Sequence, residues 1–304
     1  MYPGLGASCP GWRLTLYWSR LPRTPQFILS VDVEDYFQVE AFARQVSRTD
    51  WDQYPSRVVA NTQRTLGLFD EFGVKGTFFV LGWVARKFPA LVAEIQSRGH
   101  ELACHSFWHR PVYTLTPEAF REDLRESRDA IQQAGGAAVV GYRAPTWSIT
   151  AQSMWALDVL VEEGFVYDSS IFPIRHDLYG IPGAQRFPYR LKTQSGELME
   201  FPPATVKVWN SILPSAGGGY LRILPFPYTR WALRRLAEED GRAVVMYFHP
   251  WEIDPAQPRI QSRAKSRFRH YTNLGRMEPR LRRLMQAHPF QPFRTVIESG
   301  AAFQ

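Results

Sequence analysis

The 304-residue sequence is poor in cysteine, with only Cys9 and Cys104. So few cysteines exclude both a disulfide framework and a CxxC metal module, and the fold must therefore be stabilised by its hydrophobic core. We interpret Cys104 as a small buried residue and not as a metal ligand. Alternation along a strand would direct it away from the side taken by its neighbour His105.

Long apolar runs are also missing. The stretch Trp12 to Trp18 is interrupted by Arg13, is too short to span a bilayer, and shows no clear signal-peptide cleavage pattern. We predict that residues 1–25 form a poorly structured extension, that no transmembrane segment is present, and that the protein is cytoplasmic. The alternative is a divergent signal or membrane-proximal segment, with association with the cell envelope. No repeat, heptad or low-complexity tract occurs.

Acidic residues are fewer than basic ones, with 29 Asp and Glu against 36 Lys and Arg and a formal net charge of +7. Such a balance suits an acidic polymer, a membrane surface or nucleic acid. Much of the excess lies between Arg259 and Arg283, which we interpret as a solvated face. No recognised nucleic-acid motif is present, so nucleic acid is not a predicted partner.

From Gln26 onward, short apolar runs alternate with longer amphipathic stretches, which indicates βα units and a largely parallel sheet. The predicted strands are 27–33, 76–80, 101–105, 138–142, 165–168, 243–249 and 293–296. The predicted helices are 55–72, 89–98, 116–133, 151–164, 228–239 and 278–287. About seven such units favour an α/β fold with a closed or distorted (β/α) barrel over an open sheet. We expect one such domain, residues 26–304.

Between Ile171 and Tyr220 the alternation gives way to segments rich in Pro and Gly. We predict a hairpin there that pairs residues 189–192 with 198–201. An insertion of this kind fits a substrate-binding rim, because binding residues are concentrated on loops that a rigid scaffold positions.

Three carboxylates, Asp32, Glu34 and Asp35, follow the first predicted strand within four positions. Like charges so close together raise one another's pKa unless a cation offsets them, and a metal ion is the natural cation. The alternative is a helix N-cap or a solvated turn, which would need only Asp35.

Two histidines, His105 and His109, follow the third predicted strand. If the chain turns into a helix there, residues four apart share a face, and both imidazoles reach one metal ion. Structural histidines that cap a helix or bond within the core are the alternative.

Arg143 and His249 each end a further predicted strand. Arg143 would orient and keep ionised a catalytic carboxylate, with a surface salt bridge as the alternative. His249 taken alone suits a core histidine satisfied by the backbone. In barrels, however, chemistry gathers where strands end, so we expect these clusters to meet.

Together these motifs resemble the polysaccharide deacetylase superfamily, the NodB-homology group of carbohydrate esterases. The similar segments are Asp32-Val-Glu34-Asp35 for its acidic motif, His105 to His109 for H(S/T)xxH, Arg143-Ala-Pro145 for RxP, and His249 for its terminal histidine motif. The match runs over about residues 26 to 250. Residues 205–304 resemble the DUF3473-like branch found with exopolysaccharide synthesis and exosortase-type gene clusters.

The resemblance implies a distorted (β/α) barrel, a divalent metal that is often zinc, and hydrolysis of the acetamide of an N-acetylated sugar in a bacterial exopolysaccharide. It makes Asp32 the general base, Arg143 its tether and His249 the general acid. It makes His105 and His109 metal ligands together with one acid. Because Val33 separates Asp32 from the next acid, that ligand is Glu34 or Asp35, and the D-x-D variant favours Glu34.

Four further residues are candidate contacts for an oligosaccharide or polysaccharide substrate: Pro145, Trp147, Tyr220 and Trp251. Aromatic rings can stack on the C–H face of a pyranose, and core packing is the alternative for each of them. An O-acetyl esterase or a small cyclic-amide hydrolase would use the same centre. A catalytically inactive sugar-binding barrel is the alternative from another class of protein.

Overall fold

The computed structural model describes residues 25–239 and 243–300. Its strands are β1 Phe27–Val33, β2 Thr77–Val80, β3 Glu101–Cys104, β4 Gly141–Tyr142, β5 Tyr167–Asp168, β6 Tyr189–Lys192, β7 Glu197–Glu200, β8 Thr205–Val208, β9 Ser211–Pro214, β10 Val244–Phe248 and β11 Phe290–Gln291. Its α-helices are α1 Val58–Glu71, α2 Gly82–Lys87, α3 Pro89–Ser97, α4 Pro117–Gly135, α5 Trp155–Glu162, α6 Gly219–Ile223, α7 Phe226–Arg234, α8 Ala264–Tyr271, α9 Leu274–Ala287 and α10 Phe293–Glu298.

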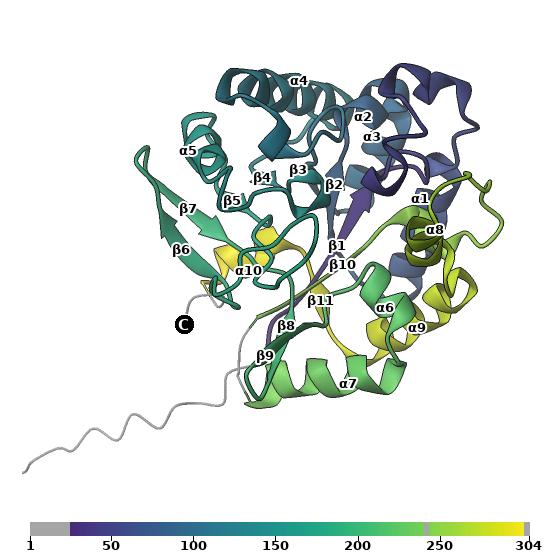
Figure 1. Cartoon of the computed structure of the whole chain (residues 1–304), viewed down its shortest axis with the longest axis vertical. Coiled ribbons are helices and arrows are strands. Elements are labelled where there is room, and N and C mark those ends of the chain that lie inside the picture. The colour runs from purple at the N-terminus through teal and green to yellow at the C-terminus, as the bar shows by residue number, and fades with distance from the viewer. Residues whose placement is uncertain (1–24, 240–242, 301–304) are drawn as a thin grey trace, which may run out of the picture.

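The main sheet has the strand order β10-β1-β2-β3-β4-β5-β7-β6, and β11 also pairs with β1. Strands β1 to β5, β7, β10 and β11 run parallel, and β6 alone joins this sheet as an antiparallel partner of β7. Within the described ranges β6 and β10 end the sheet without pairing to each other. The sheet therefore curls into a half-barrel with helices on its outer face (Figure 1), which confirms the distorted (β/α) barrel.

Most of the predicted elements are confirmed, including the hairpin of β6 and β7. The strand predicted at 293–296 is wrong, because these residues begin helix α10, and the strand β11 precedes them. A short apolar run is compatible with the periodicity of either a helix or a strand. Here Phe293 and Val296, three residues apart on one helical face, are both buried inside the half-barrel.

Helix α10 fills the base of the half-barrel. The Phe293 ring stacks on Tyr167 of β5 with 5.1 Å between centroids, and it meets Phe79 of β2 edge-on at 5.7 Å. The backbone N–H of Phe293 donates to Thr77 Oγ1, and that of Arg294 donates to the buried Glu101 carboxylate. The inner core thus depends on residues from the end of the described chain.

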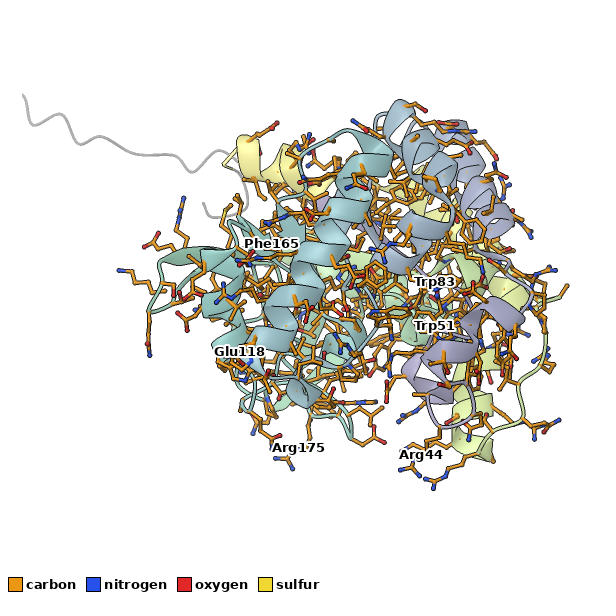
Figure 2. The ribbon with its side chains drawn as sticks, turned by 90° about the horizontal axis from the view of Figure 1, so that it is seen from above. Arg44, Trp51, Trp83, Glu118, Phe165 and Arg175 are labelled. Carbon is orange, nitrogen blue, oxygen red and sulfur yellow. The ribbon has the colours of Figure 1, made fainter. Side chains whose placement is uncertain are left out.

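Loops after the strands build one rim of the molecule. Arg44, in the loop after β1, and Arg175, in the loop after β5, project from the same side (Figure 2). Trp51 and Trp83, nearer the middle of this view, pack edge to face with 5.4 Å between their centroids. This side holds the carboxyl ends of the parallel strands, where the sequence predicts the chemistry.

A second hairpin, β8 with β9, lies outside the main sheet and was not predicted. No helix in the described ranges is both long and apolar enough to cross a bilayer. Cys104 is free and buried, as expected. Cys9 and the predicted extension 1–25 fall outside the described residues, apart from Pro25.

Candidate active site

Strand β1 carries two of the predicted acids to the carboxyl edge of the sheet. All seven residues of β1 are buried, so its Ile, Leu and Val side chains fix the register of Asp32. Asp32 and Glu34 are two residues apart, and both are almost fully buried, at 2% and 1% exposure. Buried carboxylates need a partner of opposite charge, so their neighbours decide what they do.

The segment that follows β3 brings His105 and His109 together, but not on a helix as predicted. It is an irregular loop in which Ser106 and His109 adopt left-handed backbone angles, with φ of 69° and 50°. The buried Asp123 carboxylate on α4 stabilises this loop, since it accepts hydrogen bonds from Ser106 Oγ at 2.6 Å and from the Phe107 N–H at 2.8 Å. The loop, and not helical spacing, sets the histidine pair.

Glu34, His105 and His109 form a group suited to a metal ion. Each offers one ligand atom, and these atoms lie within 4.8 Å of one another. Glu34 Oε2 is 2.8 Å from His109 Nε2. His105 Nδ1 lies 2.8 Å from the Arg143 carbonyl oxygen, which leaves Nε2 for a ligand bond. Two imidazoles and one carboxylate match a catalytic zinc site with open positions, so these residues fit a divalent metal.

Arg143, at the end of β4, reaches across the half-barrel to Asp32. Its Nη1 donates to Asp32 Oδ1 at 2.6 Å and to Ser30 Oγ at 2.8 Å. On its other side the guanidinium donates to the Ser169 hydroxyl and carbonyl oxygens. The Phe79 ring lies 4.1 Å from the guanidinium carbon. A fully buried cation is thereby paired, and Asp32 is held by one of its two oxygens.

His249 follows β10 and faces both acids. Its Nε2 is 3.8 Å from Asp32 Oδ2 and 3.7 Å from Glu34 Oε1. Its side chain is 18% exposed, against 3% for that of Asp32, so it is the most accessible of these groups. His249 is therefore the member of the cluster that a substrate can meet first.

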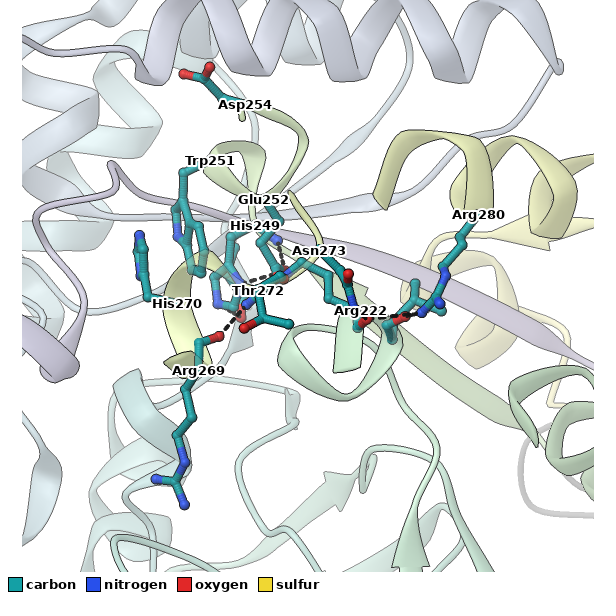
Figure 3. Close-up of polar contacts among 12 residues, drawn as sticks. Arg222, His249, Trp251, Glu252, Asp254, Arg269, His270, Thr272, Asn273 and Arg280 are labelled. Atoms are coloured by element: carbon teal, nitrogen blue, oxygen red, sulfur yellow. Dashed lines mark hydrogen bonds and ion pairs between the residues drawn. The ribbon is translucent and has the colours of Figure 1, made fainter. Parts of the chain in front are cut away.

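A carboxylate behind His249 orients the ring (Figure 3). Glu252 Oε2 is 3.0 Å from His249 Nδ1 and also accepts the His249 backbone N–H, because the chain forms a capping box at Pro250–Ile253. Glu252 Oε1 accepts from Arg222 Nε at 2.6 Å. Arg222 in turn donates to the carbonyl oxygens of Arg269 and Thr272, and it is fully paired.

The electrostatics of the site separate its two kinds of histidine. Burial alone would lower the pKa of His249, but the bond to Glu252 and the charges of Glu34, Glu252 and Asp32 outweigh it and raise the pKa to about 9. Burial lowers the pKa of His105 to about 4. Burial also opposes ionisation of Glu34, yet the charges of His109, His249 and His105 lower its pKa to about 2. His105 is thus neutral and Glu34 anionic near pH 7, as metal ligands must be.

Two family models match the chain. The model described as "Polysaccharide deacetylase" matches residues 44–160, which include both histidines of the loop and Arg143. The model described as "Domain of unknown function (DUF3473)" matches residues 169–298, which include His249, Glu252 and Arg222. Residues 44–160 therefore match the polysaccharide deacetylase family. Asp32 and Glu34 lie before the first match, so their place in the site comes from the fold.

Curated relatives of this superfamily are similar over part of their length. A peptidoglycan deacetylase-like protein of Gibberella zeae is 28% identical over 132 residues, which cover 42% of this chain and 38% of the relative. A peptidoglycan-N-acetylglucosamine deacetylase of Bacillus cereus is 28% identical over 98 residues, which cover 32% of this chain and 36% of the relative. The chain thus spans well under half the length of these deacetylases.

Solved structures share the fold. The crystal structure of a Mycobacterium smegmatis protein described as a polysaccharide deacetylase has a TM-score of 0.62 and 21% identity, covering 97% of this chain and 94% of that one. The structure of Puue allantoinase has a TM-score of 0.60 and 14% identity, covering 93% of this chain and 92% of that one. At these identities the likeness concerns the architecture alone.

Of the two acids left open by the sequence, Glu34 joins the histidines and Asp35 does not. The Asp35 carboxylate accepts hydrogen bonds from Ser56 Oγ and from the backbone N–H groups of Arg57 and Val58. These N–H groups belong to the start of α1, whose unpaired donors an acid stabilises. This is the helix-terminus role that the sequence offered as the alternative.

The predicted sugar contacts are mostly buried. Trp251 is 5% exposed and lies stacked between His249 and His270, while its indole N–H donates to Glu34. Trp147 is also 5% exposed and packs against Tyr247, and Pro145 is buried. Trp251 thus contacts Glu34 and Trp147 contacts Arg143, and neither has much free ring surface.

Tyr220 is the half-buried member of that set. Its hydroxyl lies 3.1 Å from the hydroxyl of Tyr179, in the loop after β5. The two tyrosines place a pair of hydroxyl groups on the predicted rim insertion.

Several site residues were missed by the sequence reasoning. Glu252 carried a usable signal, since an acid three residues after His249 fits a capping box. No sequence signal pointed to Arg222, Asp123 or Ser169, because folding brings each of them to the site from a distant segment.

Proposed function

We propose that this chain is a metal-dependent hydrolase that removes acetyl groups from N-acetylated sugars in a polysaccharide. One observation carries the proposal. Three groups lie together at the carboxyl ends of four strands. They are Asp32 paired with the buried Arg143, the group of Glu34, His105 and His109, and His249 oriented by Glu252. A buried arrangement of this kind costs stability, and it suits amide hydrolysis.

Glu34, His105 and His109 would hold the metal. A divalent ion bound by them would polarise the acetyl carbonyl group and lower the pKa of water. We propose zinc, because two imidazoles and one carboxylate are a frequent zinc set. Glu34 directly follows β1, and His105 and His109 lie in the loop after β3. All three are buried, so the protein sets their spacing.

Asp32 would act as the general base. Arg143 occupies Oδ1, while Oδ2, which lies 3.8 Å from His249 Nε2, would accept the proton from water. His249 would act as the general acid. Glu252 occupies its Nδ1, so the Nε2 proton faces the acids and can pass to the departing amine. General acid–base catalysis of this type accelerates such steps by about 10²- to 10⁴-fold.

We further propose that the substrate is an exopolysaccharide made in the cytoplasm or at the cell envelope. The DUF3473 match over residues 169–298 supports this setting, since the sequence resembles that branch there. The net charge of +7 suits an anionic polymer.

Acetate release tests the function. The full chain is stripped with a chelator, reloaded with Zn²⁺, Co²⁺, Mn²⁺ or Mg²⁺, and given an N-acetylglucosamine oligomer, an O-acetylated xylan and allantoin. We expect acetate from the first substrate only, and only with metal. Release from the ester or ring opening of allantoin would favour the alternative hydrolases. Sugar binding without turnover would identify an inactive barrel.

A further inference from the structure

The hairpin of β8 and β9 carries an exposed aromatic ring among cations. Trp209, at its tip, is 91% exposed. It lines a groove of about 350 Å³ together with Arg186, Lys207 and Arg235. The hairpin lies next to α7 at the lower end of the molecule (Figure 1), and the groove contains none of the catalytic residues.

A larger groove of about 750 Å³ lies between α7 and α9. Phe226 and Trp231 supply its apolar wall, and Arg230, Arg234 and Arg283 supply its charge. The Arg283 guanidinium lies 5.8 Å from the centroid of the Phe226 ring. Aromatic side chains and cations therefore alternate along this groove.

The two grooves form one surface, which we call the basic–aromatic face. They are joined where the Arg235 guanidinium lies 5.7 Å from the Trp231 ring. Among the described residues that line them, six are Lys or Arg and one, Glu238, is acidic. The Glu238 carboxylate lies 3.7 Å from Arg234, and Lys207, Arg230 and Arg283 contribute the positive charge on which the docking depends.

The backbone conformation of Trp209 indicates that the turn itself does not require a tryptophan. Its φ is 50°, in the left-handed region that Asn and Gly occupy most easily in a hairpin turn. A bulky aromatic residue gains nothing from this place in the turn, and its ring contributes little to the core. The exposed ring of Trp209 is therefore suited to contact a binding partner.

We propose that the basic–aromatic face docks on an anionic lipid surface. Tryptophan favours the boundary between hydrocarbon and water, and arginine pairs with lipid phosphates while its stem lies along apolar surface. Trp209 would enter the headgroup layer, and the arginines of α7 would meet the phosphates. The active site would then stay free for its substrate.

The sequence before residue 25 has the same chemistry. It contains Arg13, Arg20 and Arg23 with Trp12 and Trp18, and it has no acidic residue. It leads into β1, whose first residue pairs with the first residue of β10, the strand that follows α7 along the chain. An acidic polysaccharide would also meet the charges. However, a ring that stands out at the tip of a hairpin suits insertion better than stacking in a groove.

Vesicle flotation of the full chain tests the proposal. We expect binding to vesicles of 70% phosphatidylcholine and 30% phosphatidylglycerol, no binding to pure phosphatidylcholine, and release by salt. The variants are Trp209→Asn, which suits the turn, and the double variant Arg230→Glu with Arg283→Glu. Each basic residue near an anionic surface contributes enough that the double variant should bind at least about tenfold more weakly.

Matched changes elsewhere serve as controls. Phe268→Ser removes an aromatic ring that is 58% exposed on α8, and Arg267→Glu reverses an exposed charge beside it. Both should bind vesicles as the unchanged protein does. Binding by all variants alike, or by none of the proteins, would overturn the proposal. If the unchanged protein does not bind vesicles but binds polygalacturonate tightly, the face belongs to an acidic polymer instead. Acetate release by Trp209→Asn should stay unchanged in solution, so this test is independent of the proposed reaction.

Discussion

Arg143 Nη1 lies 2.6 Å from Asp32 Oδ1, and the two buried side chains come from strands that are 111 residues apart in the sequence. Asn at position 32 would keep the shape but could not accept a proton. We expect Asp32→Asn to lower the rate of acetate release by about 10²- to 10⁴-fold. The metal content should not change, because Asp32 lies outside the group of Glu34, His105 and His109. Parallel acetate and metal assays measure both quantities, and Asp129→Asn, exposed on α4, is the control. An unchanged rate of acetate release in Asp32→Asn would show that Asp32 is not the general base.

Neighbouring acids should behave differently when removed. Glu34→Ala should lose the metal and the activity. Asp35→Ala should keep the metal but unfold more easily, by about 1–3 kcal/mol for the charged hydrogen bonds it gives up at the start of α1. Metal titration calorimetry and urea unfolding separate the two effects. Loss of metal from Asp35→Ala with normal stability would reverse the assignment.

The protonation of His249 should depend on Glu252. In the metal-free protein a pKa of about 9 leaves His249 protonated at pH 7, and the proton is lost as the pH rises through that value. Glu252→Gln removes a negative charge and should shift this pKa downward, and with it the alkaline limb of the activity profile. NMR titration of His249 measures the pKa directly. The variant Glu197→Gln, at the exposed first position of β7, should leave it unchanged.

A histidine far from the site should make stability depend on pH. Burial lowers the pKa of His100 from 6.5 to about 4, so between these values the unfolded chain binds a proton that the folded chain does not. Stability is therefore complete above pH 6.5 and falls as the pH drops, by about 2 kcal/mol at pH 5 from this residue.

Replacing His100 with Gln should flatten that dependence even though it removes ring contacts with Phe69 and Phe78. Urea unfolding at pH 5, 6 and 7 gives the slope. Phe78→Leu, which weakens the same cluster without removing a titrating group, should keep the original slope. Equal slopes in His100→Gln and the unchanged protein would contradict the prediction.

Local patterns were enough to predict the alternating elements and four of the site's clusters. Buried strands such as β1 and β10 are short and mostly apolar, and each is followed directly by a polar residue, Glu34 or His249. The carboxyl ends of parallel strands share one edge of the sheet. Their position after four predicted strands was therefore enough to predict that Asp32, His105, Arg143 and His249 lie together.

Interactions between distant segments were out of reach. The pairing of Arg222 with Glu252 needs a helix and a loop to pack together, and nothing in either segment encodes the other. The same holds for Asp123, which fixes a histidine loop from α4. The strand predicted at 293–296 was wrong because so short an apolar run fits a helix and a strand equally well.

The placement of Phe293 has a consequence for how the molecule is made. Its ring packs against β2 and β5, and the strand just before it pairs Phe290 with Phe27. During synthesis this interior cannot close until residues 290–296 have left the ribosome, long after strands β1 to β5, so its inner wall stays exposed to water until then. Contacts of such long sequence separation slow folding. During that interval the growing polypeptide would depend on chaperones or on its outer helices to avoid aggregation.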